Sequence, residues 1–168
     1  VRTASAGRIP AGMGRYQVQG SLWGMAEVAR QSGKGERMNV YIACSLARRD
    51  LAIEVGRALV HAGHRIASSW HDDHRATVAS EAALTTGEEA IIRNRCFREV
   101  ATADVLVLVA CPGERHGAHV EAGFALGRDV PVVTFLAGGI DSILTRGGPF
   151  AVDAADLLDV LATMEVHP

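Results

Sequence analysis

The sequence predicts an α/β domain with a flavodoxin-like (Rossmann-like) parallel sheet of four to five strands and helices on both faces. Short apolar runs alternate with helix-forming segments, which is typical of parallel strands connected by crossover helices. The run DVLVLVAC is apolar throughout, as expected for a strand covered on both faces. With 168 residues, of which 48% are hydrophobic, the chain is long enough to bury a core.

The first half of the domain is expected to open with a buried strand. The segment NVYIAC (39–44) is short, apolar and partly β-branched, which favours a strand. A helix over 47–63 follows and ends at Gly63. Its apolar face is formed by Leu51, Val55, Ala58 and Leu59. The segment HRIASSW (64–70) predicts the second strand.

A polar segment separates the second strand from the next long helix. Residues 71–87 are expected to form a loop with a short helix, and residues 88–103 a regular helix. The core face of that helix is predicted to contain Ile91, Ile92, Cys96 and Val100. The run DVLVLVAC (104–111) is the third strand and the clearest of all.

The last part of the chain repeats the alternation. Residues 117–127 predict a short helix, and residues 130–136 a fourth apolar strand. A long glycine-rich loop over 137–150 is expected next. A closing helix spans 153–164, with Asp153 as its N-cap.

The amino-acid composition indicates how the domain is organised and disfavours several classes of function. Residues 1–37 are rich in Gly, Ser, Arg and Gln and predict a loosely ordered extension, with Met38 as an alternative start and 38–168 as the domain. The net charge is −2 and no basic block occurs, which disfavours a nucleic-acid partner. An odd number of cysteines, without CxxC spacing, favours a reducing cytoplasm. The sequence has no secretion signal and no apolar run long enough for a membrane span.

Ligands of open parallel sheets bind at the carboxyl ends of the strands, near the point where the strand order reverses. That edge is predicted to collect four loops, at 45–49, 68–75, 111–117 and 137–149. No GxGxxG or Walker-type loop follows the first strand, which disfavours dinucleotide redox chemistry and P-loop phosphoryl transfer. We expect no cofactor.

Glu121 is unusual because it is set in a helix that is otherwise small and apolar. We expect it in the first turn, where backbone N–H groups and the helix dipole favour an ionised carboxylate. An ionised carboxylate at the ligand edge is suited to attack an electrophilic carbon, such as the anomeric carbon of a sugar. The alternative is a glutamate that only complements the helix dipole.

Residues 39–150 resemble the nucleoside 2-deoxyribosyltransferase family and the related 2′-deoxynucleoside 5′-phosphate N-hydrolases. The resemblance is carried by VYIACSLARRD, AGHRIASSW, ATADVLVLV and, most specifically, GAHVEAGFALGRDVPVV. It implies that Glu121 is the nucleophile and that the hydroxyl of Tyr41 orients it. The pattern departs at Cys96, where the family has an aspartate that contacts or protonates the base. It also departs at Arg115, where the transferases have an acidic residue.

Other side chains at the predicted edge are candidates for substrate binding. The resemblance implies that the loop with Ser45, Arg48 and Arg49 holds a 5′-phosphate, and the alternative is a solvated helix start. Trp70 is expected to stack on a base or to lie at a subunit contact. Further candidates near Glu121 are His119, as general acid or phosphate contact, and Cys96, Arg115 and Gly117 in the substrate site. The HDDH segment at 71–74 is more typical of a solvated loop than of a metal site, and we expect no metal.

The sequence therefore predicts cleavage or transfer at the N-glycosidic bond of a (deoxy)nucleoside or nucleoside 5′-monophosphate, through a glycosyl-enzyme on Glu121. The alternatives are a nucleotide-binding sensor without turnover and an NAD-cleaving domain of the Toll/interleukin-receptor type. The expected partner is a small nucleoside or nucleotide, and the resemblance implies a homo-oligomer.

Overall fold

The computed structural model describes residues 37–70, 84–110, 117–136 and 148–164. It forms one five-stranded sheet in which every pair of neighbouring strands is parallel, in the order β2-β1-β3-β4-β5. The strands are β1 (Asn39–Ala43), β2 (Arg65–Ile66), β3 (Val105–Ala110), β4 (Val132–Leu136) and β5 (Phe150–Ala151). This confirms the predicted α/β, flavodoxin-like fold.

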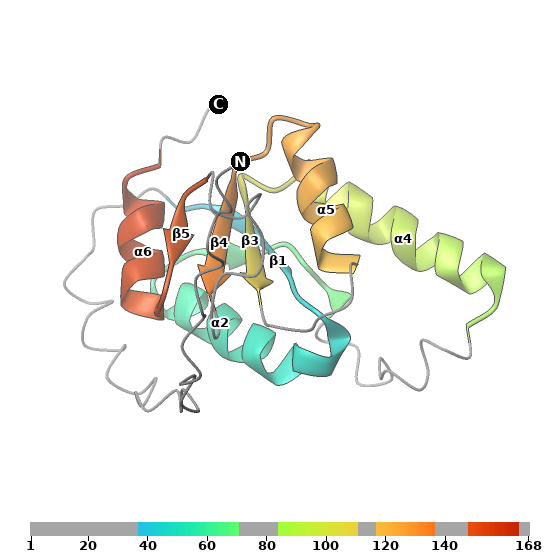
Figure 1. Ribbon diagram of the computed structural model, residues 1–168, viewed down its shortest axis with the longest axis horizontal. Helices are drawn as coiled ribbons and strands as arrows, with labels where there is room; N and C mark the ends of the chain where they lie inside the picture. Colours follow the sequence, from blue (N-terminus) through green and yellow to red (C-terminus); the bar gives the residue numbers. More distant parts are fainter. Residues whose placement is uncertain (1–36, 71–83, 111–116, 137–147, 165–168) are drawn as a thin grey trace, which may run out of the picture.

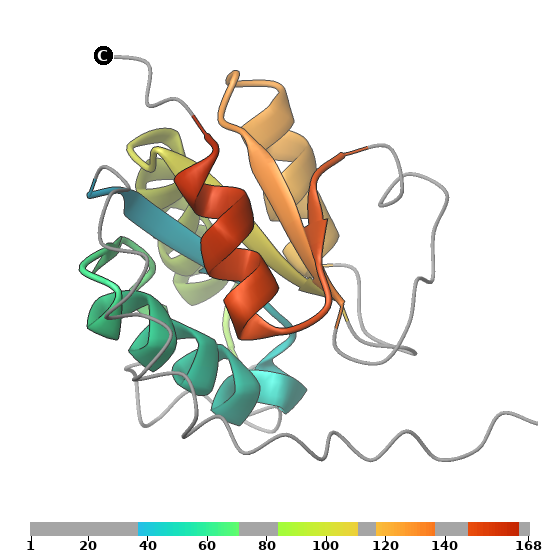
Figure 2. The same cartoon turned by 90° about the vertical axis from the view of Figure 1, so that its left-hand side faces the viewer.

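Helices cover both faces of the sheet (Figure 1). Within the described residues they are α2 (Arg49–His61), α4 (Thr86–Ala101), α5 (Gly117–Leu126) and α6 (Ala154–Ala162), with a short 3-10 turn, η2 (Leu46–Arg48), ahead of α2. Helices α2 and α6 pack together on one face, and α4 and α5 pack together on the other. Figure 2 shows α6 and α2 in front of the sheet and α5 behind it.

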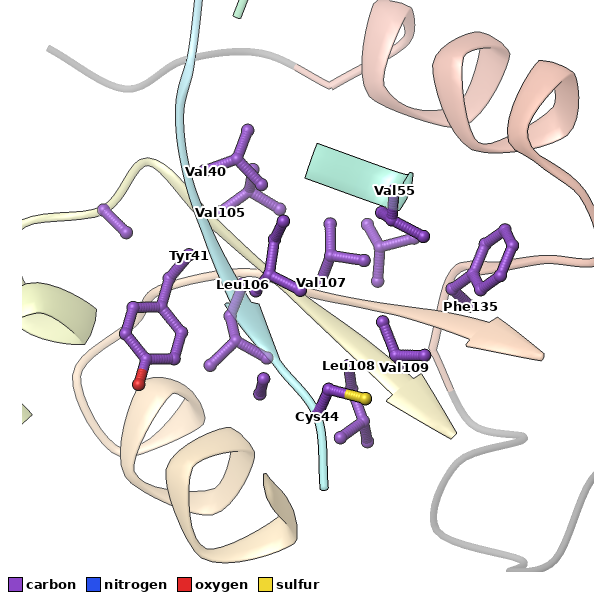
Figure 3. Close-up of a cluster of buried hydrophobic side chains, with 14 of the residues drawn as sticks. Val40, Tyr41, Cys44, Val55, Val105, Leu106, Val107, Leu108, Val109 and Phe135 are labelled. Atoms are coloured by element: carbon purple, nitrogen blue, oxygen red, sulfur yellow. The ribbon is translucent and has the colours of Figure 1, made fainter. Parts of the chain in front are cut away.

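Side chains along β1 alternate between the two faces, as the pleat of a strand requires. Ile42 points towards α2, because its Cδ1 lies 3.3 Å from the position that a Cβ on Gly56 would occupy. Tyr41 therefore points towards α4 and α5. The valines and leucines of β1 and β3 that surround it are buried (Figure 3).

Strand β2 is much shorter than the predicted strand over 64–70. The Ala67 N–H still donates to the Val40 carbonyl at 2.8 Å, and beyond Ala67 side chains supply the hydrogen bonds to β1. The backbone N–H of Ile42 donates to the Ser68 hydroxyl at 3.1 Å, and the Trp70 indole N–H donates to the Ile42 carbonyl at 2.9 Å. The edge of β1 thus stays satisfied while the chain after β2 moves away from it.

Helix α4 starts with a capping box, in which Thr85 and Glu88 bind each other's backbone N–H groups. Cys96 and Val100 are buried as predicted. The prediction that Ile91 and Ile92 face the core is wrong, because they are 69% and 36% exposed. Among the described residues, the buried positions of α4 lie in its second half, and Figure 1 shows its first half reaching past α5.

Three predicted helix ends are confirmed. Gly63 follows α2 with a φ of 97°, a backbone conformation that side-chain-bearing residues rarely adopt. Asp153 caps α6 by accepting a hydrogen bond from the N–H of Asp156 at 2.9 Å. Helix α5 ends at Leu126, and the N–H of Gly127 bonds back to Gly123 at 3.1 Å. The predicted extension, apart from Arg37, and most of the loop over 137–150 lie outside the described residues.

Candidate active site

The two residues that sequence analysis paired, Tyr41 and Glu121, meet in the structure. The Tyr41 hydroxyl donates a hydrogen bond of 2.9 Å to Oε1 of Glu121. Tyr41 lies on β1, next to Leu106 of β3, and Glu121 lies on the helix that follows β3. Because the strand order reverses between β1 and β3, the pair sits beside the switch point where such sheets bind ligands.

A stripe of small residues lets α5 approach the sheet closely. Ala118, Ala122 and Ala125 are the buried positions of the helix and follow its i, i+4, i+7 period. Glu121 flanks this stripe, so its side chain reaches the strand rather than the solvent. In Figure 3 the Tyr41 hydroxyl oxygen lies against α5.

The prediction that Glu121 lies in the first turn of its helix is wrong. Helix α5 begins at Gly117 and has no acidic residue in its first turn. The dipole effect falls off within one turn, so it does not explain how the carboxylate is held. Side-chain donors have this role instead.

Cys96 supplies the second donor. Its thiol donates to the Glu121 carboxylate and lies against the Tyr41 hydroxyl. The side chain comes from α4 and is buried. Three elements, β1, α4 and α5, thus contribute one side chain each to a compact cluster.

Burial dominates the electrostatics of this cluster. It raises the pKa of Glu121 to about 7, against the opposing effect of the hydrogen bonds from Tyr41 and Cys96. It also raises the pKa of the Cys96 thiol to about 11, with the negative charge of Glu121 adding to the effect. The pKa of the Tyr41 hydroxyl is raised for the same two reasons. At neutral pH, Glu121 is the group of the three that changes its charge.

Glu99 is a second carboxylate near the cluster. It lies three residues after Cys96 on α4, a spacing that places both side chains on the same side of a helix. Its negative charge raises the pKa of both Glu121 and Cys96. The Ser69 backbone N–H donates to its Oε2 at 3.1 Å, and the Ser69 hydroxyl donates to its Oε1 at 2.5 Å. Glu99 is therefore held in place by the segment that follows β2.

An aromatic pair fixes the two helices of the cluster against each other. The rings of Phe97 on α4 and Phe124 on α5 stack with centroids 4.5 Å apart and an interplanar angle of 18°. Phe97 follows Cys96, and Phe124 lies three residues after Glu121. Arg95, which precedes Cys96, has a buried Nε without a hydrogen-bond partner in the described part of the chain.

The sequence predictions did not identify Glu99, Ser69 or the phenylalanine pair. The helical spacing from Cys96 to Glu99 was a usable signal. Ser69 was hidden by the prediction of a longer second strand, which would have placed it in the ladder. No sequence prediction was made for Phe97 or Phe124, which lie in two different helices.

Four other predicted site residues lie on other elements, and two of them make hydrogen bonds to the backbone. The Ser45 hydroxyl caps η2 by accepting from the N–H of Ala47 at 3.3 Å. Arg48 is exposed and Arg49 is partly buried, both at the start of α2. Trp70 is 9% exposed, with its indole bonded to β1. Phosphate binding by the arginines and base stacking by Trp70 stay predictions.

The structure does not bring His119 to the Tyr41–Glu121 pair. His119 is exposed and lies two residues before Glu121, a spacing that puts side chains on different faces of a helix. Its role as general acid stays a prediction. Gly117 is the exposed first residue of α5, and its role in binding also stays a prediction. Arg115 and the HDDH segment lie outside the described residues.

Across residues 37–70, 84–110, 117–136 and 148–164, His, Cys, Asp and Glu side chains form no group of three or more that is suited to hold a metal ion. No helix within these same ranges has the length and apolar character needed to cross a bilayer.

No protein-family model matches the chain, and a comparison with curated proteins likewise gives no match.

The buried carboxylate leads to a stability prediction. The pKa of Glu121 is about 7 in the folded protein against 4.5 for a free glutamate. The stability linked to this group is full below pH 4.5 and is lost as the pH rises through about 7, by about 3 kcal/mol. Since Gln does not titrate, Glu121→Gln should gain that amount relative to the wild type between pH 4 and pH 8. Urea unfolding at several pH values measures the difference.

Glu89→Gln is the matched control, because Glu89 is an exposed glutamate in the first turn of α4. It should leave the pH dependence of stability unchanged. A difference between Glu121→Gln and wild type that is the same at pH 4 and pH 8 would contradict the raised pKa.

Proposed function

We propose that this protein cleaves or transfers the N-glycosidic bond of a nucleoside or nucleoside 5′-monophosphate, with Glu121 as nucleophile. The observation that carries the proposal is the hydrogen bond from Tyr41 to Glu121 beside the switch point of the sheet. The resemblance of residues 39–150 to the deoxyribosyltransferase family supports it independently, since it assigns the same two residues the same roles.

The proposed reaction is a double displacement. A carboxylate oxygen of Glu121 bonds to C1′ while the C1′–N bond breaks, and the bonding electron pair leaves with the base. Water, or a second base, then attacks C1′, loses a proton, and releases the carboxylate. The hydrogen bonds from Tyr41 and Cys96 lower the pKa of Glu121 and so favour its ionised form before each turnover.

A nucleotide-binding sensor is the second candidate, and one observation favours it. Tyr41, Cys96 and Glu99 are the described side chains that act on the pKa of Glu121, and none of them is an obvious proton donor for a departing neutral base. Free base as a product distinguishes the two functions, because a sensor binds the nucleotide and releases none.

The central prediction is the loss of base release in Glu121→Ala. A panel of deoxynucleosides, ribonucleosides and their 5′-monophosphates is incubated with the protein, and free base is measured by chromatography. Loss of the nucleophile should lower base release by several orders of magnitude, because the glycosyl-enzyme no longer forms. Free base without an acceptor indicates a hydrolase, and exchange only with added base indicates a transferase.

Tyr41→Phe serves as the informative companion variant. The tyrosine hydrogen bond lowers the pKa of Glu121, so its removal should move the midpoint of the pH–rate profile above 7. Glu121→Ala with activity within a few-fold of wild type would eliminate this residue as nucleophile.

A second prediction concerns the 5′-phosphate. If Arg48 and Arg49 hold it, replacing both with Ala should raise KM for monophosphates about tenfold or more and leave KM for nucleosides nearly unchanged. Arg57→Ala is the control, because Arg57 is an exposed arginine further along α2. Equal losses on both substrate types would refute the phosphate assignment.

We also propose that the chain forms a homo-oligomer. The exposed apolar side chains of Ile91, Ile92 and Val120 on the neighbouring helices α4 and α5 support this, because water disfavours such a surface. Light scattering should give a mass of at least two chains, and Ile91→Lys should lower it. A monomeric mass for the wild type at micromolar concentration would contradict the proposal.

A further inference from the structure

We propose that the site acts on N-glycosides whose departing base already carries a positive charge, because the described side chains around Glu121 offer negative charge and no spare proton. This inference rests on the proposed function and specifies its substrate class. Two sources share the chemistry: quaternary pyridinium glycosides and N7-alkylated purine nucleosides.

The described proton donors near Glu121 are already engaged. The Tyr41 hydroxyl uses its single proton in the hydrogen bond to Glu121. The Cys96 thiol donates to the same carboxylate, and burial makes it a weaker acid, with a pKa of about 11. Both oxygens of Glu99 accept hydrogen bonds from Ser69, which is the arrangement of an ionised carboxylate. Among the described neighbours of Glu121, none is thus set to protonate a departing base.

Two carboxylates determine the charge of the site. Glu121 and Glu99 come from two different helices, and the charge of Glu99 raises the pKa of Glu121. The charge of Arg95 lowers the pKa of the Cys96 thiol, whereas the pKa of Glu121 stays raised, at about 7. A cation bound beside Glu121 would lower this pKa and so favour the ionised nucleophile. Ser69 fixes the Glu99 side chain through two hydrogen bonds, so this carboxylate is in position before the ligand arrives.

The charge of the base determines whether its departure needs a proton. When the C1′–N bond of a cationic base breaks, its electron pair neutralises the base, which leaves uncharged without a proton. A neutral base would leave as an anion next to two carboxylates unless an acid protonated it. General acid catalysis is worth about 10²–10⁴-fold, so a site without it strongly favours the cationic leaving group.

The test uses two matched pairs of substrates. One pair is 7-methyl-2′-deoxyguanosine and 2′-deoxyguanosine, and the other is nicotinamide riboside and its neutral dihydro form. Base release is divided by the uncatalysed rate at the same pH, so that the intrinsic lability of the charged base cancels. The expected result is an advantage of about tenfold or more for the cationic member of at least one pair. The pair that shows it identifies the source.

Glu99→Gln should reduce that advantage by about tenfold, because it removes the charge and keeps the shape of the side chain. Glu99→Asp keeps the charge and should retain most of the advantage, which separates charge from folding. Glu89→Gln removes an exposed charge near the other end of α4 and should have no effect. Melting temperatures verify that each variant folds.

The outcomes distinguish this inference from the function on which it rests. Release of no base from any nucleoside would overturn both. Equal normalised rates for cationic and neutral members would overturn the inference and leave the glycosidase function standing. Equal losses on both members in Glu99→Gln would do the same, since Glu99 would then only support the fold.

Discussion

The hydrogen bond between Tyr41 and Glu121 is the constraint on which the rest of the site depends. A tyrosine in the middle of a buried strand needs a partner for its hydroxyl, and a buried carboxylate needs donors. Each group satisfies the other at 2.9 Å, across the gap between β1 and α5. The contact requires a helix that approaches the sheet closely, which the alanine stripe of α5 permits. It also requires a fixed partner helix, which the Phe97–Phe124 stack provides.

Burial and hydrogen bonding have opposite effects on the pKa of Glu121. Desolvation disfavours the ionised form, whereas Tyr41 and Cys96 favour it, and desolvation prevails. The resulting pKa of about 7 places the two protonation states of Glu121 near balance at neutral pH. Ion-pairing with a lysine or arginine would have kept it ionised but also less reactive. Carboxylates with a strongly shifted pKa are concentrated in functional sites. At a purely structural position of this kind, an apolar residue would be favoured instead.

Much of the fold was predictable because it depends on local apolar pattern. The strands and helices from β1 to α6 were expected except β5, which begins at Phe150 in the predicted loop over 137–150, and Gly63 and Asp153 were identified as helix ends. Errors arose where tertiary contacts override the pattern. Ile91 and Ile92 lie on the free half of α4, and β2 stops where Ser68 and Trp70 bond to Ile42. The Tyr41–Glu121 contact came from family resemblance, since no local signal joins residues 80 positions apart. The role of Glu99 could not be predicted, because it depends on the position of Ser69 in the segment after β2.

Cys96 and Glu99 are best understood as one arrangement. A carboxylate at position 96 would lie against both Tyr41 and Glu121, where the thiol now donates a hydrogen bond. Three carboxylates would then share one low-dielectric region, and their repulsion would hold Glu121 protonated and unreactive. With a thiol at 96, the nearest residue stays neutral and the charge lies three residues further along α4, fixed by Ser69. In the proposed reaction, the thiol spares Glu121 a third neighbouring carboxylate and leaves the departing base without an acid at position 96. This exchange suits a base whose departure needs no proton, so the proposal makes the charge of the base the deciding property of the substrate.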